Sequence, residues 1–168
     1  METVTIEKAN VRKAYQVAKG DLKEALATLF GSLVISQDPM SFESYEEICA
    51  AEGIDPVSSL PFQHPKTKKE VSSNGCFKLE TIFEAFNKRC GVEFNELWES
   101  DYTDVSQDKW YPIHEWVPSR SAFVYTDTGY AHTNTRLGAR LCTDTNAKAT
   151  RIAKQFTKEW NEFLNPQL

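Results

Sequence analysis

The sequence predicts an α+β fold: helices in the N-terminal part, then a small antiparallel sheet of about three strands, with a C-terminal amphipathic helix packed on it. Over about the first ninety residues, apolar side chains recur at steps of three and four, the period of a helix with one buried face. From Lys109 the apolar pattern alternates, which indicates strands, and the end of the chain returns to the helical period. We expect one domain over 1–168, with a helical part at about 1–98 and the sheet with its C-terminal helix at about 109–165.

Four helical segments are expected before the sheet. The range 6–30 holds two of them, and a third runs from a capping serine, Ser44, to a stop at Gly53. The fourth covers about 77–90. Between the third and the fourth, 64–75 is polar with little periodicity, which predicts an exposed loop.

Three antiparallel strands are the simplest interpretation of the alternating part, at 109–117, 121–126 and 137–143. Pro118 favours a tight turn between the first two, and 127–136 is expected to form a longer hairpin loop. Because proline cannot donate a ladder hydrogen bond, Pro112 places the first strand at a sheet edge or at a bulge.

The C-terminal helix has the strongest periodicity in the chain. It is expected to begin at Asp144 or Thr145 and to end before Pro166. One apolar stripe runs along it: Ala149, Ile152, Ala153, Phe156, Trp160, Phe163 and Leu164. Such a stripe needs a covering surface, and the sheet is the surface that we expect.

Composition and charge argue against several classes of function. The formal net charge of -5 and the pI near 5.3 repel polyanions, so no nucleic-acid partner is expected. Glycine-rich nucleotide motifs are missing and no cofactor is expected. The four cysteines have neither CxxC spacing nor a nearby histidine at zinc-like spacing, so no metal site is expected.

The N-terminal residues do not resemble an export signal, and no apolar run reaches the roughly eighteen residues of a membrane span. We therefore expect no membrane partner, a cytoplasmic location and reduced thiols.

Four short segments carry a resemblance: Lys109–Pro112 (Lys-Trp-Tyr-Pro), Ser121–Phe123, Gly138–Cys142, and Ala153–Phe156 with Phe163 and Leu164. Together they resemble a group of small hypothetical proteins from phages and prophages of gut bacteria. The resemblance covers roughly the last sixty residues, and the helix at 79–86 more loosely. It implies a phage or mobile-element origin, and hence a bacterial host cell, but no activity. The chain departs from the group at Cys90–Val92 and in a longer acidic stretch through Glu99 and Asp108.

Two histidines are the candidates for catalysis. His114 and its neighbour Glu115 should point to opposite faces of a strand, so they cannot form a local acid/base pair. His132 is the better candidate general base, because it lies in the expected loop with Asp127 or Arg136 within reach. No nucleophile stands out, since a cysteine in a strand is usually a core residue.

Aromatic side chains are dense between Trp98 and Tyr130, and arginines lie close to them in the sequence. Aromatic rings with arginine are typical of recognition surfaces, although the same rings would also fill a core. The candidate binding residues are Trp110, Tyr111, Arg120, Tyr130 and Arg140. Arg140 has two readings: an ion pair with an acid of the 99–108 stretch, or contact with an anionic ligand.

The sequence favours a non-enzymatic phage or prophage accessory protein that binds a protein partner. Two alternatives stay open. One is a small enzyme or ligand binder with a site near His114, His132, Arg120 and Arg140. The other is a virion or assembly component, which would form a symmetric oligomer; the sequence itself says nothing of the oligomeric state.

Overall fold

The computed structural model describes residues 14, 18–30, 40, 42–88, 98–133 and 140–168. Backbone contacts group the chain into two units, Met1–Asp38 and Pro39–Leu168, and each is considered by itself. The expected single domain stays a prediction. In the first unit the described helix is α2, Asp21–Phe30, preceded by Gly20 with a φ of 54°. The helix expected in the first part of 6–30 falls mostly outside the described residues.

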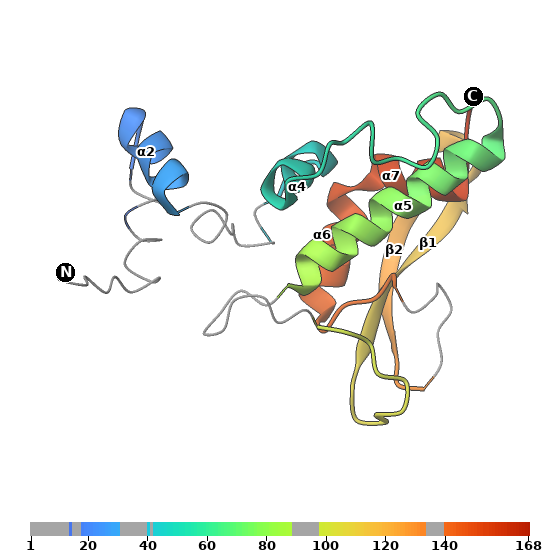
Figure 1. Cartoon of the computed structure of the whole chain (residues 1–168). Coiled ribbons are helices and arrows are strands. Elements are labelled where there is room, and N and C mark those ends of the chain that lie inside the picture. Colours follow the sequence, from blue (N-terminus) through green and yellow to red (C-terminus); the bar gives the residue numbers. More distant parts are fainter. Residues whose placement is uncertain (1–13, 15–17, 31–39, 41, 89–97, 134–139) are drawn as a thin grey trace. The chain divides into compact units, whose positions relative to one another are not determined.

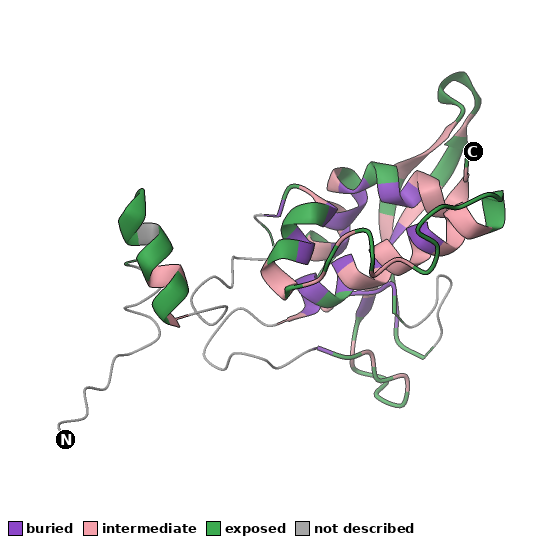
Figure 2. Ribbon diagram, turned by 45° about the horizontal axis from the view of Figure 1, so that its top comes forward, coloured by how far each residue is buried: buried purple, intermediate pink, exposed green. Residues whose placement is uncertain are grey.

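The second unit mixes helices and strands, so the α+β class is confirmed. Its elements in chain order are α4 (Tyr45–Glu52), α5 (Lys68–Asn87), β1 (Lys109–Val117), the short 3-10 helix η2 (Pro118–Arg120), β2 (Ala122–Ala131), α6 (Asn146–Gln155) and α7 (Thr157–Leu164), as Figure 1 shows. Its buried residues gather where these elements meet (Figure 2). No helix of the described residues is long and apolar enough to cross a membrane.

The prediction for α4 is confirmed at both ends. The Ser44 side chain accepts a hydrogen bond from the Glu47 N–H, and Gly53 ends the helix with a φ of 69°. A residue with this φ is in the left-handed region, which glycine adopts without steric cost.

The prediction of an exposed loop over 64–75 is wrong for most of this range, because α5 begins at Lys68 rather than at about Phe77. Thr67 and Glu70 form a reciprocal capping box at its start. Polar contacts then fix the first turns: the Asn74 side chain both donates to the Phe62 carbonyl and accepts from the Phe62 N–H. Because these contacts are polar and long-range, the apolar period did not reveal them.

Gly75 also belongs to this first half of α5. A Cβ atom at Gly75 would lie 2.6 Å from the Phe163 backbone nitrogen, so only a glycine allows α5 and α7 to approach this closely. The Ser72 hydroxyl donates to the Phe163 carbonyl at 2.8 Å beside this contact.

The described sheet has two strands, not three. β1 and β2 pair antiparallel from Lys109 with Ala131 to Val117 with Ala122, and the register shifts after Ile113. β2 therefore includes 127–131, which the sequence analysis had assigned to a loop.

Of the third strand expected at 137–143, the described part is 140–143, and there only Thr143 forms an isolated bridge, with Trp110. The tight turn expected at Pro118 is confirmed as η2.

The C-terminal stripe forms two helices rather than one, because Phe156 has non-helical backbone angles (φ -101°, ψ 41°) between α6 and α7. Several contacts join these helices to β2. The Phe123 N–H donates to Asn161 Oδ1 at 2.8 Å, and Asn161 Nδ2 donates to the Phe123 carbonyl at 3.0 Å. The Tyr125 hydroxyl lies 3.3 Å from that of Thr150.

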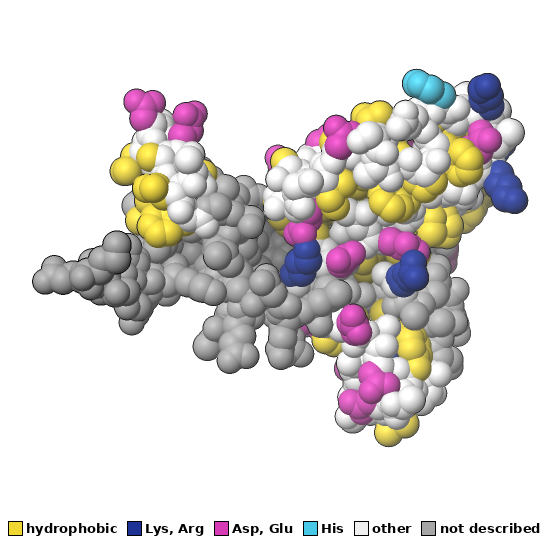
Figure 3. Space-filling view, viewed as in Figure 1, with side chains coloured by type: hydrophobic (Ala, Val, Ile, Leu, Met, Phe, Trp, Pro, Cys, Tyr) yellow, Lys and Arg dark blue, Asp and Glu magenta, His cyan; other side chains and the backbone are white. Residues whose placement is uncertain are grey.

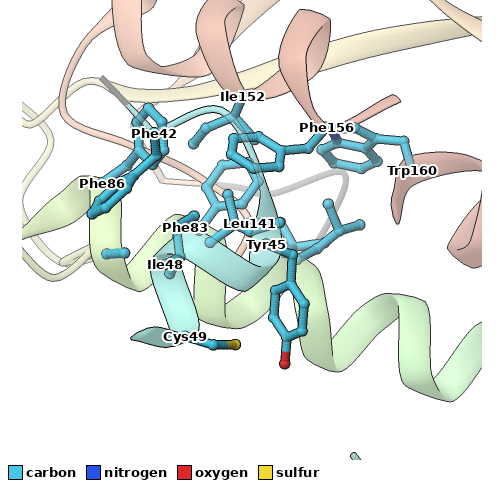
Figure 4. Close-up of a cluster of buried hydrophobic side chains, with 13 residues drawn as sticks. Phe42, Tyr45, Ile48, Cys49, Phe83, Phe86, Leu141, Ile152, Phe156 and Trp160 are labelled. Carbon is cyan, nitrogen blue, oxygen red and sulfur yellow. The ribbon is translucent and has the colours of Figure 1, made fainter. Parts of the chain in front are cut away.

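The main core gathers side chains from α4, α5, α6 and α7 (Figure 4). Aromatic rings dominate it: Phe83 meets Trp160 edge to face at 6.1 Å, and Phe86 meets Phe156 in the same way at 5.9 Å. A second, smaller cluster lies on the sheet side and consists of Trp98, Tyr111, Ala131 and Cys142, with Ile113 packed against it.

Candidate functional site

Two of the predicted binding residues meet on the hairpin. Trp110 of β1 and Tyr130 of β2 are direct cross-strand partners, with ring centroids 5.0 Å apart. His132 continues this row, with its ring 5.5 Å from that of Tyr130. Tyr130 is 56% exposed, although it is a large ring in a paired strand. We call Trp110, Tyr130 and His132 the hairpin aromatic patch.

The backbone under the patch is held on both sides. At Trp110, one edge of strand β1 pairs with β2. At the other edge the Trp110 N–H donates to the Thr143 carbonyl at 2.9 Å, and the Trp110 carbonyl accepts from the Thr143 N–H at 2.8 Å. A ring carried by such a backbone loses little further freedom when it binds, which favours a role as an anchor.

His132 pairs with an acid that the sequence analysis did not choose. Its Nε2 lies 2.8 Å from Asp108 Oδ1, one step beyond the Lys109–Ala131 pair that starts the sheet. Asp127, the expected partner, instead accepts a hydrogen bond from the Thr128 N–H, and Arg136 falls outside the described residues. The His132–Asp108 pair is open to solvent on both sides, and it joins the two ends of the hairpin.

His114 is half-buried. Its ring lies at a tilt against that of Trp160, with centroids 4.4 Å apart, and its Nε2 atom is buried without a hydrogen-bond partner. Burial lowers the pKa of His114 from 6.5 to about 4, so the ring is neutral at pH 7. Glu115, beside it, is exposed, as the alternation of a strand predicts.

Tyr111 and Arg120 do not join the patch. Tyr111 is 9% exposed, and its ring lies over Gly129, where an added Cβ would come within 3.0 Å of it. Arg120 is exposed in η2, which forms the turn between the two strands at the end of the hairpin away from the patch. Of the four residues in the predicted enzyme or ligand site, His114, His132 and Arg120 therefore lie at three different places on the hairpin.

Arg140 lines a cavity of about 370 Å³. Helix α5 contributes three side chains to the wall, and the segment after it in the described chain contributes three more: Glu80, Glu84 and Asn87, then Trp98, Glu99 and Ser100. The Arg140 Nη1 atom lies 3.2 Å from Glu80 Oε2. Of the two readings of Arg140, the structure thus shows an ion pair, but with Glu80 rather than with an acid of 99–108.

Asn87 is the most buried polar group of this wall, at 6% exposure. The Asn87 Nδ2 atom donates to the Cys142 carbonyl at 2.8 Å, and the backbone carbonyl of Asn87 accepts from the Trp98 N–H at 3.0 Å. Its Oδ1 has no hydrogen-bond partner. A buried acceptor without a donor costs about 1–3 kcal/mol, which makes this amide oxygen the least satisfied atom of the wall.

Cys142 does not carry an activated thiol. It is buried in the smaller core cluster, and its Sγ lies 3.9 Å from the Tyr102 hydroxyl. Burial, as the main cause, raises the pKa of the Cys142 thiol, so the thiolate needed for attack is disfavoured at neutral pH.

The cavity was missed by the sequence analysis for a simple reason. Glu80 and Glu84 are one helical turn apart on an exposed side of α5, which is the ordinary pattern of a solvated helix. Nothing local in the sequence connects them with Arg140, sixty positions beyond Glu80. No family model, no curated protein and no solved structure matches this chain.

Proposed function

We propose that this protein is a non-enzymatic binding module of phage or prophage origin, acting in the bacterial cytoplasm, that holds a protein partner on the hairpin aromatic patch. The observation that carries the proposal is the exposed Tyr130 ring, which packs at a tilt against Trp110 on a paired strand. Trp and Tyr dominate the binding energy of protein interfaces, because their rings bury a large area while losing few rotamers.

The expected architecture provides the frame for this proposal. We take the Trp110–Thr143 bridge as the described end of a third strand, and the contacts of Asn161 and Thr150 with β2 as part of a C-terminal helix packed on the sheet. Both features would keep the patch rigid before a partner arrives.

The charges around the patch favour a partner with basic groups at the rim. Asp108 borders the patch through His132, and Asp101 and Asp104 lie in the loop before it. Hydrogen bonds from Thr103 hold the pKa of Asp101 below its usual range, and those from Ser106 do the same for Asp104. Both carboxylates are therefore ionised at neutral pH, and a partner with lysine or arginine around an apolar centre would complement them.

Trp116 offers a matched control for the experiment. It is 45% exposed, its ring meets that of Phe123 edge to face at 5.5 Å, and it lies at the opposite end of the same hairpin. A photo-crosslinking amino acid is placed at position 130 in one sample and at position 116 in another, in cells of a bacterial host. The proposal predicts one protein crosslinked from position 130 and not from 116; equal crosslinking from both positions, or none from 130, would contradict it.

The virion or assembly alternative gives a different readout in the same samples. A symmetric oligomer would place a second copy of this chain against position 130, so the crosslinked product would have twice the mass of the chain. Native mass spectrometry of the purified protein would then show the same oligomer without any added partner.

A further inference from the structure

Lys109 is a lysine that the fold buries: it is the first residue of β1, it pairs with β2, and it is 1% exposed. Its neighbours on both sides belong to the proposed binding surface, since Trp110 is part of the hairpin aromatic patch and Asp108 pairs with His132. We propose that Lys109 is the positioning residue of this surface, whose buried ammonium holds the 99–108 loop so that the acids of the loop meet basic groups of the protein partner. The inference rests on the proposed function and deepens it.

The described contacts of the Lys109 ammonium come from the loop before it. Its Nζ donates to the Asp104 carbonyl at 3.1 Å and to the Gln107 carbonyl at 2.8 Å. It also lies over the ring of Tyr102, 5.3 Å from the ring centroid. Because a buried charge is costly unless hydrogen bonds compensate it, these contacts tie the loop to the first residue of the sheet.

Gln107 closes the neck of the loop. Its Oε1 accepts a hydrogen bond from the Asp101 N–H at 2.7 Å, and its Nε2 donates to the Glu99 carbonyl at 3.0 Å. Inside the loop, the carboxylates of Asp101 and Asp104 each accept a hydrogen bond at 2.6 Å from the hydroxyl two residues later. The start and the end of the loop are thus joined by one amide, and its middle is held by Lys109.

The loop presents acids to solvent and continues the patch. Its exposed acidic residues are Glu99, Asp101, Asp104 and Asp108. Between them Val105 is 67% exposed, and Figure 3 shows acidic side chains (magenta) and apolar ones (yellow) on this loop, at the bottom of the view. Ionised acids around an apolar side chain complement a partner that carries lysine or arginine around its own apolar contact.

Charge and positioning predict opposite effects when Lys109 is replaced. Removing a positive charge from beside four acids would, by charge alone, strengthen the attraction of a basic partner. Removing the anchor instead frees the carbonyls of Asp104 and Gln107 to bond to water, and the partner then has to order the loop as it binds, which weakens affinity. The sign of the change therefore identifies the role of Lys109.

The decisive variant is Lys109→Met, which keeps a long apolar side chain and removes the ammonium. The Kd of the partner crosslinked from position 130 should rise about tenfold, and its dependence on salt should become weaker, since the acids of the loop no longer meet the partner in one arrangement. The matched control is Lys78→Met in α5, because Lys78 is also largely buried, at 14% side-chain exposure, and its loss changes the net charge equally. Lys78→Met should leave the Kd within about twofold.

A second readout needs no partner. The {1H}-15N NOE of the Thr103 and Ser106 amides, measured on the full chain, should fall in Lys109→Met and stay unchanged in Lys78→Met, because only the first variant releases the loop. Should Lys109→Met fail to fold, Gln107→Ala replaces it, since it opens the neck of the loop and leaves Lys109 in place. Gln107→Ala should lower the same NOE values and raise the Kd about fivefold.

An unchanged or lower Kd in Lys109→Met overturns the inference, whether or not the loop has become mobile. Equal losses in Lys109→Met and Lys78→Met also overturn it, because they would show a general effect on the fold. The proposed function fails separately: if Tyr130→Ala leaves the Kd unchanged while Lys109→Met raises it, the loop binds the partner and the patch does not. If Tyr130→Ala raises the Kd and Lys109→Met does not, the patch stands and the role of Lys109 is refuted.

Discussion

The imidazole of His114 lies against the indole of Trp160, with ring centroids 4.4 Å apart and 36° between the ring planes. This contact joins β1 to α7 in the interior of the second unit. Both rings keep a nitrogen, Nε2 of His114 and Nε1 of Trp160, that is buried without a hydrogen-bond partner. The packing therefore depends on a neutral histidine, since a buried charge without a partner is costly.

The free energy of unfolding should consequently decrease as the pH is lowered through a defined window. The pKa of His114 is about 4 in the fold and near 6.5 in the unfolded chain, so the unfolded chain takes up the proton first. Stability from this group is complete above pH 6.5 and is lost as the pH falls toward 4, by up to about 3 kcal/mol. The His114→Phe variant should flatten this part of the stability curve, measured by urea unfolding at several pH values.

The matched control for this experiment is His64→Gln, because His64 is exposed. It should retain the slope of the unmodified protein between pH 6.5 and 4. An equal slope in His114→Phe and in the unmodified protein would show that His114 is not the titrating group.

A second prediction concerns the contact between α5 and α7 at Gly75. An alanine there would place its Cβ 2.6 Å from the Phe163 nitrogen and 2.8 Å from the Glu162 carbonyl carbon, and both are backbone atoms. Gly75→Ala should therefore cost about 1–3 kcal/mol of unfolding free energy, although alanine is the better helix former.

Ser73→Ala tests the helix without the contact, because among the described residues the Ser73 hydroxyl donates to the Lys69 carbonyl of its own helix and to no other element. Its effect should stay within about 0.5 kcal/mol. Chemical unfolding of both variants compares them directly, and a stabilised Gly75→Ala protein would mean that α5 and α7 do not approach as described.

A third prediction concerns Glu159, a carboxyl that is 7% exposed near the start of α7. Burial is the main cause that raises its pKa, and the nearby Glu162 adds to the effect. A raised pKa in the fold means that stability is present below the unfolded pKa and is lost as the pH rises. Glu159→Gln should stabilise the protein at pH 7 by about 0.5–2 kcal/mol, and by much less below pH 4.5.

Glu162→Gln should behave in the opposite way at pH 7. The Glu162 carboxylate accepts a hydrogen bond from Lys78 at 2.7 Å, and both side chains are largely buried. The neutral glutamine at position 162 would leave the Lys78 ammonium without this ion pair and lower the melting temperature. Thermal unfolding at pH 7 and at pH 4 separates the two glutamates, and a destabilised Glu159→Gln protein at pH 7 would contradict the role assigned to burial.

The sequence was informative where local chemistry decides structure. Ser44 and Gly53 bound α4 as expected, because capping and left-handed stops act over a few residues. The first half of α5 was missed although Thr67 and Glu70 give a local capping signal at its start, because its side chains are mostly polar and its packing depends on contacts of Asn74 with Phe62 and of Gly75 with Phe163. The break at Phe156 was missed because the apolar stripe continues through it at helical spacing, so the periodicity carries no signal of the change from α6 to α7.

The candidate sites divide in the same way. Trp110 and Tyr130 were chosen from composition, but their cross-strand pairing was not predicted, because 127–131 was expected to be part of a loop and instead extends β2. The cavity depends on Glu80, Asn87 and Arg140, which only the tertiary structure brings together. Local composition therefore selected the two rings, whereas their pairing and the wall built from three separate segments needed the tertiary structure.

The most direct test of the proposed function is the affinity of the partner crosslinked from position 130 for two variants of the purified protein. Tyr130→Ala should raise its Kd about thirtyfold, which corresponds to a hot-spot residue at the centre of an interface. Trp116→Ala, at the other end of the hairpin, should leave the Kd within about twofold of the unmodified protein. An unchanged Kd for Tyr130→Ala, with both variants folded, would contradict the assignment of the hairpin aromatic patch as the binding surface.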